Sequence, residues 1–124
     1  ESEKESAYHV RHSAEWIIRL GDGTDESHRR AQAAIDGLWA FTGEMFAVDD
    51  SERGLIDAGI AVDPATLRAQ WLKLVSDVVS EATLSLPAND WMQQGGRSGR
   101  HSEHLGHLLS ELQSMQRTFP GATW

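Results

Sequence analysis

The sequence predicts an all-α fold in which helices pack as a bundle. Apolar residues recur at spacings of three and four along four segments, which is the period of a helix with one buried face. Residues that favour helix starts and helix ends flank these segments. Almost no stretch shows the strict alternation of polar and apolar residues that is typical of a half-buried strand. Four helices with one apolar face each indicate an all-α bundle.

Two helices are predicted in the first part of the chain. The first ends at Gly21-Asp22-Gly23, and its apolar stripe consists of Ala7, Val10, Ala14, Ile17 and Ile18. Thr24 or Asp25 is expected to cap the second helix, whose stripe consists of Ala31, Ala34, Ile35, Leu38, Phe41 and Met45. Gly37 and Gly43 each cost about 1 kcal/mol relative to alanine inside a helix, so we expect another backbone to approach them closely.

Two further helices follow a polar connection. Residues 49–62 are predicted to form a connecting loop with room for a short helical turn. Asp63-Pro64 is the clearest helix start, because Asp63 is a strong N-cap and proline suits the first helical position. The stripe behind it consists of Leu67, Trp71, Leu74, Val75, Val78, Val79 and Ala82. After a long loop over residues 87–100, Ser102 is expected to cap a last helix, whose apolar residues are Leu105, Leu108, Leu109, Leu112 and Met115.

Composition limits the possible classes of protein. A length of 124 residues is one domain at most, and the formal net charge of −8 argues against a general nucleic-acid binder. The absence of cysteine excludes disulfides and thiolate chemistry and is consistent with the cytoplasm. No apolar run approaches the ~18 residues of a membrane span. Because the chain begins with Glu1 and no cap precedes the first stripe, we expect a piece of a longer protein.

The histidines do not follow a metal-binding pattern. Di-iron carboxylate bundles use Glu-x-x-His, because residues three apart project in the same direction into the core. His9 has Ser6 at that distance and Glu5 one position further away, and Glu-x-x-His occurs nowhere in the chain. His101, His104 and His107 are spaced by three, so the first and last point about 120° apart on a helix. We therefore expect no metal site in this chain.

Two other features allow more than one interpretation. The loop from Gly95 to Arg100 is rich in glycine and precedes a helix N-terminus, so it could cradle a phosphate, although a mobile surface loop is the simpler interpretation. A catalytic histidine also stays open, but no Gly-x-Ser-x-Gly elbow is present. Trp39 and Trp71 are expected to pack in the core, whereas Trp91 and Trp124 favour an interface.

Several blocks of residues resemble one protein family, the C subunits of the bacterial phenylacetyl-CoA epoxidases, which epoxidise the aromatic ring in phenylacetate degradation. The resemblance runs from Lys4 to Trp124. Its blocks are Lys4-Glu5-x-x-Tyr8-His9, Arg19-Leu20-Gly21-x-Gly23-Thr24-Asp25, Leu38-Trp39-x-Phe41-Thr42-x-Glu44-x-Phe46, Gly59-Ile60-Ala61-Val62-Asp63-Pro64, Glu81-Ala82-Thr83-Leu84, Gly95-Gly96, His101-x-Glu103-His104-Leu105-Gly106 and Pro120-Gly121-x-x-Trp124. It implies a ferritin-like helical bundle, of which residues 1–124 would be the C-terminal half of a single domain.

The resemblance also implies a function. In this family the C subunit lacks di-iron ligands and supports the catalytic A subunit, which holds the iron. The expected partners are therefore that A subunit, the missing N-terminal half of the same chain, and phenylacetyl-CoA as a shared substrate, with no cofactor in this chain. The expected substrate contact is the loop Arg53-Gly54-Leu55, through which the chain would help to hold the CoA moiety. The alternative is a self-associating helical binding module without an oxygenase role.

Overall fold

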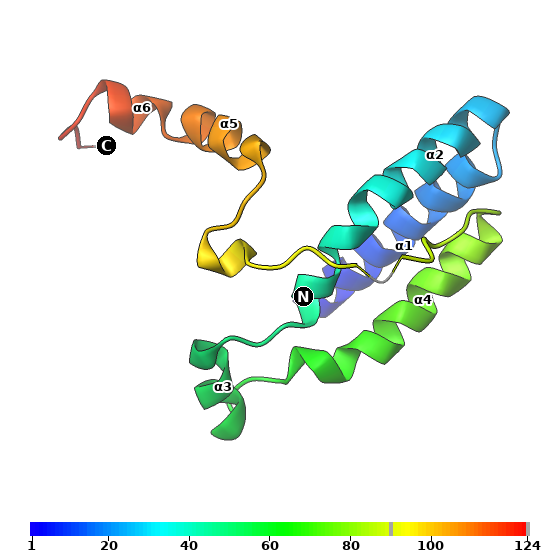
Figure 1. Ribbon diagram of the computed structural model, residues 1–124, viewed down its shortest axis with the longest axis horizontal. Coiled ribbons are helices and arrows are strands. Elements are labelled where there is room, and N and C mark those ends of the chain that lie inside the picture. The colour runs from blue at the N-terminus through cyan, green and yellow to red at the C-terminus, as the bar shows by residue number, and fades with distance from the viewer. Residues whose placement is uncertain (90, 124) are drawn as a thin grey trace. The chain divides into compact units, whose positions relative to one another are not determined.

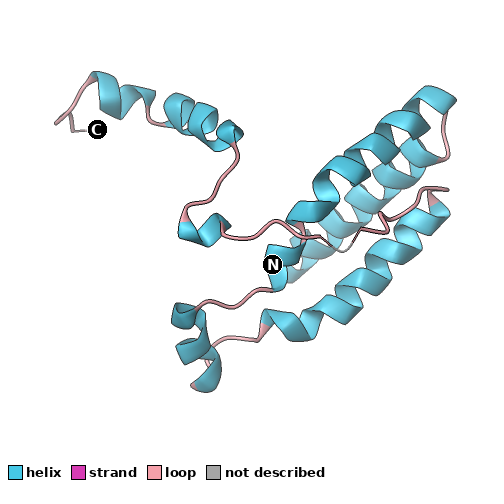
Figure 2. Cartoon of the chain, in the orientation of Figure 1, coloured by secondary structure: helices cyan, strands magenta, loops and turns pink. Residues whose placement is uncertain are grey.

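The fold consists of helices joined by turns and loops (Figures 1 and 2). The computed structural model describes residues 1–89 and 91–123, and within these residues there are six α-helices, four short 3-10 helices and no strand. The all-α prediction is therefore confirmed. The chain divides into two compact units, residues 1–93 and 94–124. No helix in the described part of the chain combines the length and the apolarity needed to cross a bilayer.

The first unit is built around three α-helices. Helix α1 spans Ser2–Gly21, α2 spans Asp25–Leu38 and α4 spans Arg68–Glu81. Helices α1 and α2 form an antiparallel hairpin, and α4 packs along α1 (Figure 1). A shorter helix, α3, spans Asp50–Asp57 between α2 and α4.

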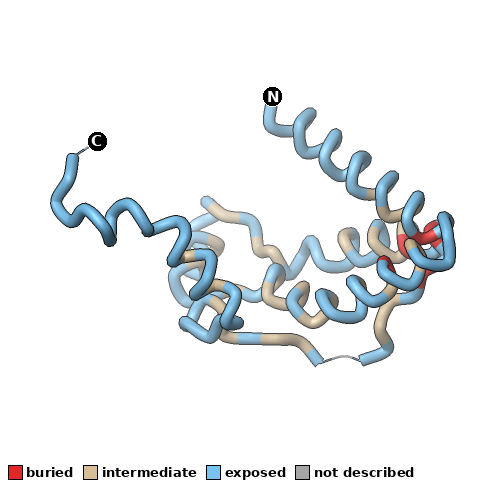
Figure 3. The backbone as a smooth tube through the Cα atoms, turned by 90° about the horizontal axis from the view of Figure 1, so that it is seen from above, coloured by how far each residue is buried: buried red, intermediate tan, exposed pale blue. Residues whose placement is uncertain are grey.

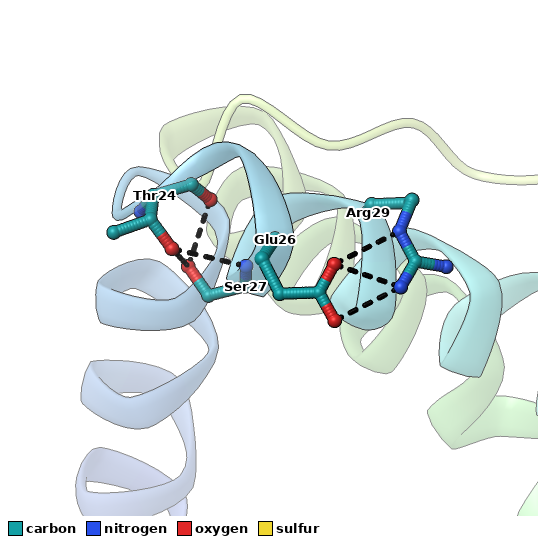
Figure 4. A network of polar contacts seen from close by, with 4 residues as sticks. All are labelled: Thr24, Glu26, Ser27 and Arg29. Carbon is teal, nitrogen blue, oxygen red and sulfur yellow. Dashed lines mark hydrogen bonds and ion pairs between the residues drawn. The ribbon is translucent and has the colours of Figure 1, made fainter.

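The turn between α1 and α2 is fixed by reciprocal side-chain capping (Figure 4). Thr24 accepts a hydrogen bond from the Ser27 backbone N–H at 3.2 Å, and the Ser27 hydroxyl accepts one from the Thr24 N–H at 2.9 Å. This capping box satisfies two backbone donors that the helix cannot satisfy itself. The nearby Glu26–Arg29 ion pair at 2.8 Å is exposed and contributes about 0–1 kcal/mol at most. The predicted cap at Thr24 is confirmed.

Helix α2 ends earlier than its apolar stripe indicated. The α-helix stops at Leu38, and the 3-10 helices η1 (Trp39–Phe41) and η2 (Gly43–Phe46) carry the rest of the stripe. The Thr42 hydroxyl donates to the Trp39 carbonyl at 2.8 Å, a local bond that competes with continued α-helix. Of the predicted stripe only Ala31 is buried and Ile35 half-buried, and the prediction of one long helix was wrong.

The two glycines of this region differ from expectation. A Cβ at Gly37 would meet nothing within 4 Å, so the expected close backbone is absent there. A Cβ at Gly43 would lie 2.8 Å from Met92 Cβ, so the close neighbour is a side chain rather than a backbone. Next to Met92, the Gln93 N–H donates to the Ala40 carbonyl at 2.8 Å. This bond holds the segment around Met92 and Gln93 against η1.

The connection after η2 is more ordered than predicted. Most of residues 49–62, expected to be loop, belongs to α3, and the Asp49 carboxylate caps this helix by accepting from the Glu52 N–H at 2.9 Å. The next helix start was predicted correctly. Asp63 accepts from the Ala65 N–H at 2.9 Å, Pro64 follows at the first position, and a 3-10 turn η3 (Pro64–Leu67) leads into α4.

The core of the first unit lies at one end of its helices (Figure 3). The buried residues among those described are few, and they are Gly21, Ala31, Val79, Ala82 and Leu84. The end of α4 lies so close to Gly21 that no side chain fits at this position. A Cβ there would overlap the Ala82 carbonyl oxygen and lie 2.8 Å from the Ala82 Cβ. Small residues thus allow the C-terminal ends of α1 and α4 to touch.

Polar contacts reinforce the same end. The Gly21 carbonyl accepts from His28 Nδ1 at 2.8 Å and from the Thr83 hydroxyl at 3.3 Å. Thr83 has a φ of 59°, which is unusual for a β-branched residue and is held in place by its surroundings. The Gln32 amide pairs with both backbone groups of Ser85 at 2.9 Å, which fastens the chain after α4 to α2.

The second unit is small and has no buried residue among those described. It contains the 3-10 helix η4 (Gly96–Ser98), helix α5 (Glu103–Leu112) and helix α6 (Ser114–Thr118). The predicted single helix is therefore divided at Gln113. Ser102 precedes α5 at the expected cap position, but its side chain makes no capping hydrogen bond.

We predict that Gly21→Ala destabilises the fold while Gly37→Ala does not. The added methyl group at position 21 has to displace the α4 backbone, and overpacking of this kind typically costs about 1–3 kcal/mol. At position 37 the methyl group meets open space, and alanine favours a helix over glycine by up to about 1 kcal/mol. Urea denaturation followed by far-UV circular dichroism measures both changes. Equal stabilities of the two variants would contradict the proposed contact.

Candidate functional site

The main surface feature of the first unit is a pair of apolar grooves. The first groove has a volume of about 630 Å³ and lies between α1 and α4; its lining includes Val10, Ala14, Leu67, Trp71 and Leu74. The second has a volume of about 620 Å³ and lies beside α2; its lining includes Leu20, Ala34, Leu38, Trp39 and Leu86. Both grooves share a floor of four residues, Ile17, Ile35, Val75 and Val79. The helical stripes that the sequence predicted for a core therefore line open surfaces.

The exposure of these stripes is large for a chain of this size. The accessible surface is 9926 Å² for a mass of 13.7 kDa. Two separate compact bodies of the sizes of the two units would expose only about 7,800 Å² by the usual scaling of surface with mass. Leu38 is 66% exposed and Leu74 is 45% exposed, and burying such a leucine fully yields about 1.5–3 kcal/mol. Covering the grooves with apolar side chains would therefore lower the free energy substantially.

A few polar side chains interrupt the lining of the first groove, namely His9, Ser13 and Gln70. His9 Nε2 lies 3.9 Å from the Glu5 carboxylate, and both side chains are about 70% exposed, at 71% and 69%. Nowhere in the described residues do three or more His, Asp or Glu side chains gather in a way that could hold a metal ion. His9 and Glu5 are therefore a surface pair on one helix.

The histidines of the second unit are also on the surface. His101, His104 and His107 are all exposed, at and beyond the start of α5. The glycine-rich turn before them is closed on itself, because the N–H groups of Ser98 and Arg100 both donate to the Gly95 carbonyl, at 3.0 and 2.8 Å. These two donors are not aimed outward, so they cannot form the cradle that the phosphate hypothesis requires.

The expected substrate-contact residues Arg53, Gly54 and Leu55 lie in α3 rather than in a loop. All three are exposed, so the Arg53 guanidinium can reach solvent and ligands. The Arg53 backbone N–H, however, donates to the Asp49 carbonyl at 3.0 Å within the helix. The expectation that this segment is a loop was therefore wrong, because helical hydrogen bonds hold its backbone. The Arg53 side chain stays a candidate contact.

The tryptophans separate into two groups. Trp71 stacks on Trp39 with ring centroids 5.7 Å apart and packs against Phe46 at 5.2 Å. This cluster connects α4 to η1 and η2. Trp39 and Trp71 therefore pack against other residues as expected, but they are only half-buried. Trp91 is 60% exposed, which agrees with its expected availability for an interface, whereas Trp124 lies outside the described residues.

Sequence reasoning missed an aromatic ladder on α1. Tyr8, His12 and Trp16 follow one another at ring separations of 5.7 and 6.4 Å. The guanidinium groups of Arg11 and Arg19 lie 5.7 and 5.8 Å from the Tyr8 and Trp16 rings. None of these residues lines either groove. The spacing of four between the three rings was the signal in the sequence that identifies this second face of α1.

Comparison with known proteins gives two matches. Residues 1–124 match the protein family described as phenylacetic acid catabolic protein. The chain is also similar to the C subunit of the 1,2-phenylacetyl-CoA epoxidase of Escherichia coli (strain K12). The two are 48% identical over 121 residues, which cover 98% of this chain and 49% of the relative. The chain therefore spans about half the length of the curated relative it matches.

We predict that Trp71→Ala destabilises the first unit by about 1.5–3 kcal/mol. Replacing a fully buried tryptophan costs about 3–5 kcal/mol, and Trp71 is half-buried against two rings. Trp16→Ala is the matched control, because Trp16 is 49% exposed and its surface contacts with His12 and Arg19 should contribute about 1 kcal/mol at most. Denaturation followed by circular dichroism compares the two. A larger effect at position 16 than at position 71 would contradict this assignment.

Proposed function

Because this chain belongs to the family of phenylacetic acid catabolic proteins, we propose that it acts as a non-catalytic, structural part of a phenylacetyl-CoA epoxidase in aerobic phenylacetate catabolism. The relative of known function is itself the C subunit of that enzyme. A subunit works with other subunits, and we propose the catalytic A subunit as the partner that this chain supports. A location in the cytoplasm is part of the same proposal.

The observation that carries this proposal is the donor set on α1. A di-iron bundle requires Glu-x-x-His, so that both ligands project in the same direction. Here the residue three positions before His9 is Ser6, and the nearest carboxylate, Glu5, forms an exposed pair with His9 along the helix surface. These residues do not fit a di-iron centre. The iron and the chemistry are therefore assigned to the partner subunit, and no reaction step is assigned to this chain.

A finer part of the proposal is a minor contact with the substrate. Coenzyme A carries a pyrophosphate and a 3′-phosphate, and a chain with a net charge of −8 has to meet them with locally placed cations. Arg53 is the only basic residue between Arg30 and Arg68, and it is exposed on α3. Acidic neighbours such as Asp49 and Glu52 weaken this contact. The exposed position of Arg53 supports a small effect on substrate affinity rather than on turnover.

Metal analysis tests the structural role. We expect the purified chain to contain no stoichiometric iron, manganese or zinc, and we expect it to co-purify with the catalytic subunit, which brings the iron. The variants His9→Ala and His104→Ala should leave the iron content of the purified complex unchanged, because neither histidine has a glutamate three positions before it. Iron bound by the chain alone and lost in either variant would refute the proposal. Self-association without affinity for the catalytic subunit would instead favour the helical binding module.

We expect Arg53→Ala to raise the apparent KM for phenylacetyl-CoA of the reconstituted complex with little change in kcat. This pattern is the sign of lost uniform binding. An exposed ionic contact contributes about 0.2–1 kcal/mol, which corresponds to a rise of roughly 1.5- to 5-fold. Steady-state kinetics at two salt concentrations measure the effect, which should be larger at low salt.

The matched control is Arg68→Ala, which removes the same charge from another exposed position in the first unit. An equal rise in KM for both variants would indicate a general charge effect. An unchanged KM for Arg53→Ala at low salt would remove Arg53 from the site and direct attention to Arg97 and Arg100.

A further inference from the structure

The last turn of α4 ends in a hydrogen-bond motif that usually contains glycine. The Thr83 N–H donates to the Ser80 carbonyl and the Leu84 N–H donates to the Val79 carbonyl, both at 3.0 Å. These two bonds define a Schellman motif, in which the residue just past the helix is left-handed and is usually glycine. Here that residue is Thr83, with a φ of 59°. A β-branched residue in this conformation costs free energy that glycine would not, so contacts elsewhere have to compensate.

The side chain of Thr83 contacts the end of another helix. Its hydroxyl lies 3.3 Å from the Gly21 carbonyl oxygen, and His28 Nδ1 lies 2.8 Å from the same oxygen. A carbonyl oxygen can only accept, so the His28 ring has to carry a proton on Nδ1. Both side chains therefore donate to one carbonyl at the end of α1. Glycine at position 83 would relieve the backbone but would lose one of these two bonds.

A row of polar residues on α2 holds the chain that follows α4. His28, Gln32 and Asp36 are spaced by four, so they lie on one face of the helix. The Gln32 amide donates to the Ser85 carbonyl and accepts from the Ser85 N–H, both at 2.9 Å. The same amide donates to the Asp36 carboxylate at 2.9 Å, which fixes its orientation. Two side chains of one helix face thus hold the backbone on either side of Leu84.

We propose that residues 83–85 form a latch that joins the end of α4 to α2 and opens as one unit. In the closed state, His28 and Gln32 hold the two ends of this segment. Leu84 lies between them and is only 6% exposed, at the end of the unit where the buried positions gather (Figure 3). The polar bonds therefore keep one apolar side chain in the core.

Opening of the latch undoes the core at this end of the first unit. Once its side-chain bonds are lost, Thr83 is no longer held in the left-handed region, and the backbone after it changes direction. Leu84 then leaves the core. Its Cδ1 lies only 3.0 Å from the position that a Cβ would occupy at Gly21, so it packs directly against the end of α1. The latch therefore controls whether the ends of α1 and α4 stay together.

Amide hydrogen exchange of the purified protein tests the latch, because a hydrogen-bonded amide exchanges only when its segment opens. The N–H groups of Leu84 and Ser85 report on the latch, and the N–H of Ile35, within α2, reports on global unfolding. In the unaltered protein the first two should be protected but should exchange faster than Ile35. Absence of protection at Leu84 would show that the latch is not closed.

Two substitutions at position 83 separate the hydroxyl bond from the strain. Thr83→Val removes the hydroxyl and keeps the branched shape, so exchange at Leu84 and Ser85 should accelerate about 3- to 10-fold. Thr83→Gly removes the hydroxyl and the strain together, so it should accelerate exchange by about twofold at most. The matched control is Thr66→Val, which removes a hydroxyl that donates to the Asp63 carbonyl at 2.6 Å, outside the latch. This control should leave both rates unchanged.

Substitutions on α2 test the other two parts of the latch. His28→Ala should accelerate exchange about 3- to 10-fold, whereas His28→Asn should stay within about twofold, because its amide places a donor near the position of Nδ1. Equal acceleration in both would contradict the proton on Nδ1. Gln32→Ala removes the partner of Ser85 but leaves Val79, the acceptor of the Leu84 N–H, in place. If the segment opens as one unit, exchange should accelerate at Leu84 as well as at Ser85.

Three further results would overturn the proposal. Exchange at Leu84 and Ser85 that keeps pace with Ile35 in every variant would show that the segment opens only with the whole fold. Slower exchange in Thr83→Gly together with unchanged exchange in Thr83→Val would show that the hydroxyl holds nothing. Acceleration limited to Ser85 in Gln32→Ala would show that the attachments act independently. None of these readouts depends on epoxidation, so they stand apart from the proposed function.

Discussion

The arrangement of the first unit depends on one close backbone contact, where the end of α1 meets the end of α4. Gly21 can lie against the Ala82 carbonyl only because it has no side chain. Two hydrogen bonds reinforce this contact, because the Gly21 carbonyl accepts from His28 Nδ1 and from the Thr83 hydroxyl. Thr83 is held at a positive φ in this arrangement, and Gln32 fastens Ser85 shortly after it. A strained backbone position of this kind persists only where the surrounding contacts over-determine it.

This anchor at one end explains why the rest of the unit is open. Away from this contact the apolar stripes of the helices are largely exposed, and they become the walls of two grooves. The same residues would be ordinary core residues in a closed ferritin-like bundle, which is the fold of this family. The exposure of Leu38 and Leu74 is therefore no flaw in the amphipathic pattern, because large exposed apolar surfaces commonly mark interaction sites.

The polar side chains of the chain bear on the supporting role that we propose. Its histidines in the second unit are exposed, and His9 forms an exposed pair with Glu5 on the surface of α1. In the glycine-rich turn before α5, two N–H groups donate to the carbonyl of Gly95 within the same turn. The surface also carries exposed apolar area, an aromatic ladder with two arginines, and exposed Trp91. These are features of protein interfaces.

The sequence by itself determined the all-α class and where the main helices begin, because these follow from local effects. Capping by Thr24, the Asp63-Pro64 start and the apolar period act within a few residues of each other. It also determined that His9 lacks a glutamate three positions away. The end of α2 at Leu38 and the helix that carries Arg53 were not predicted, although local bonds at Thr42 and Asp49 accompany them. Only the tertiary structure decided that Gly21 rather than Gly37 marks a close contact. The reason is that an apolar stripe specifies which face is to be covered, whereas the covering partner is chosen by contacts between residues far apart in the chain, such as Gly21 and Ala82.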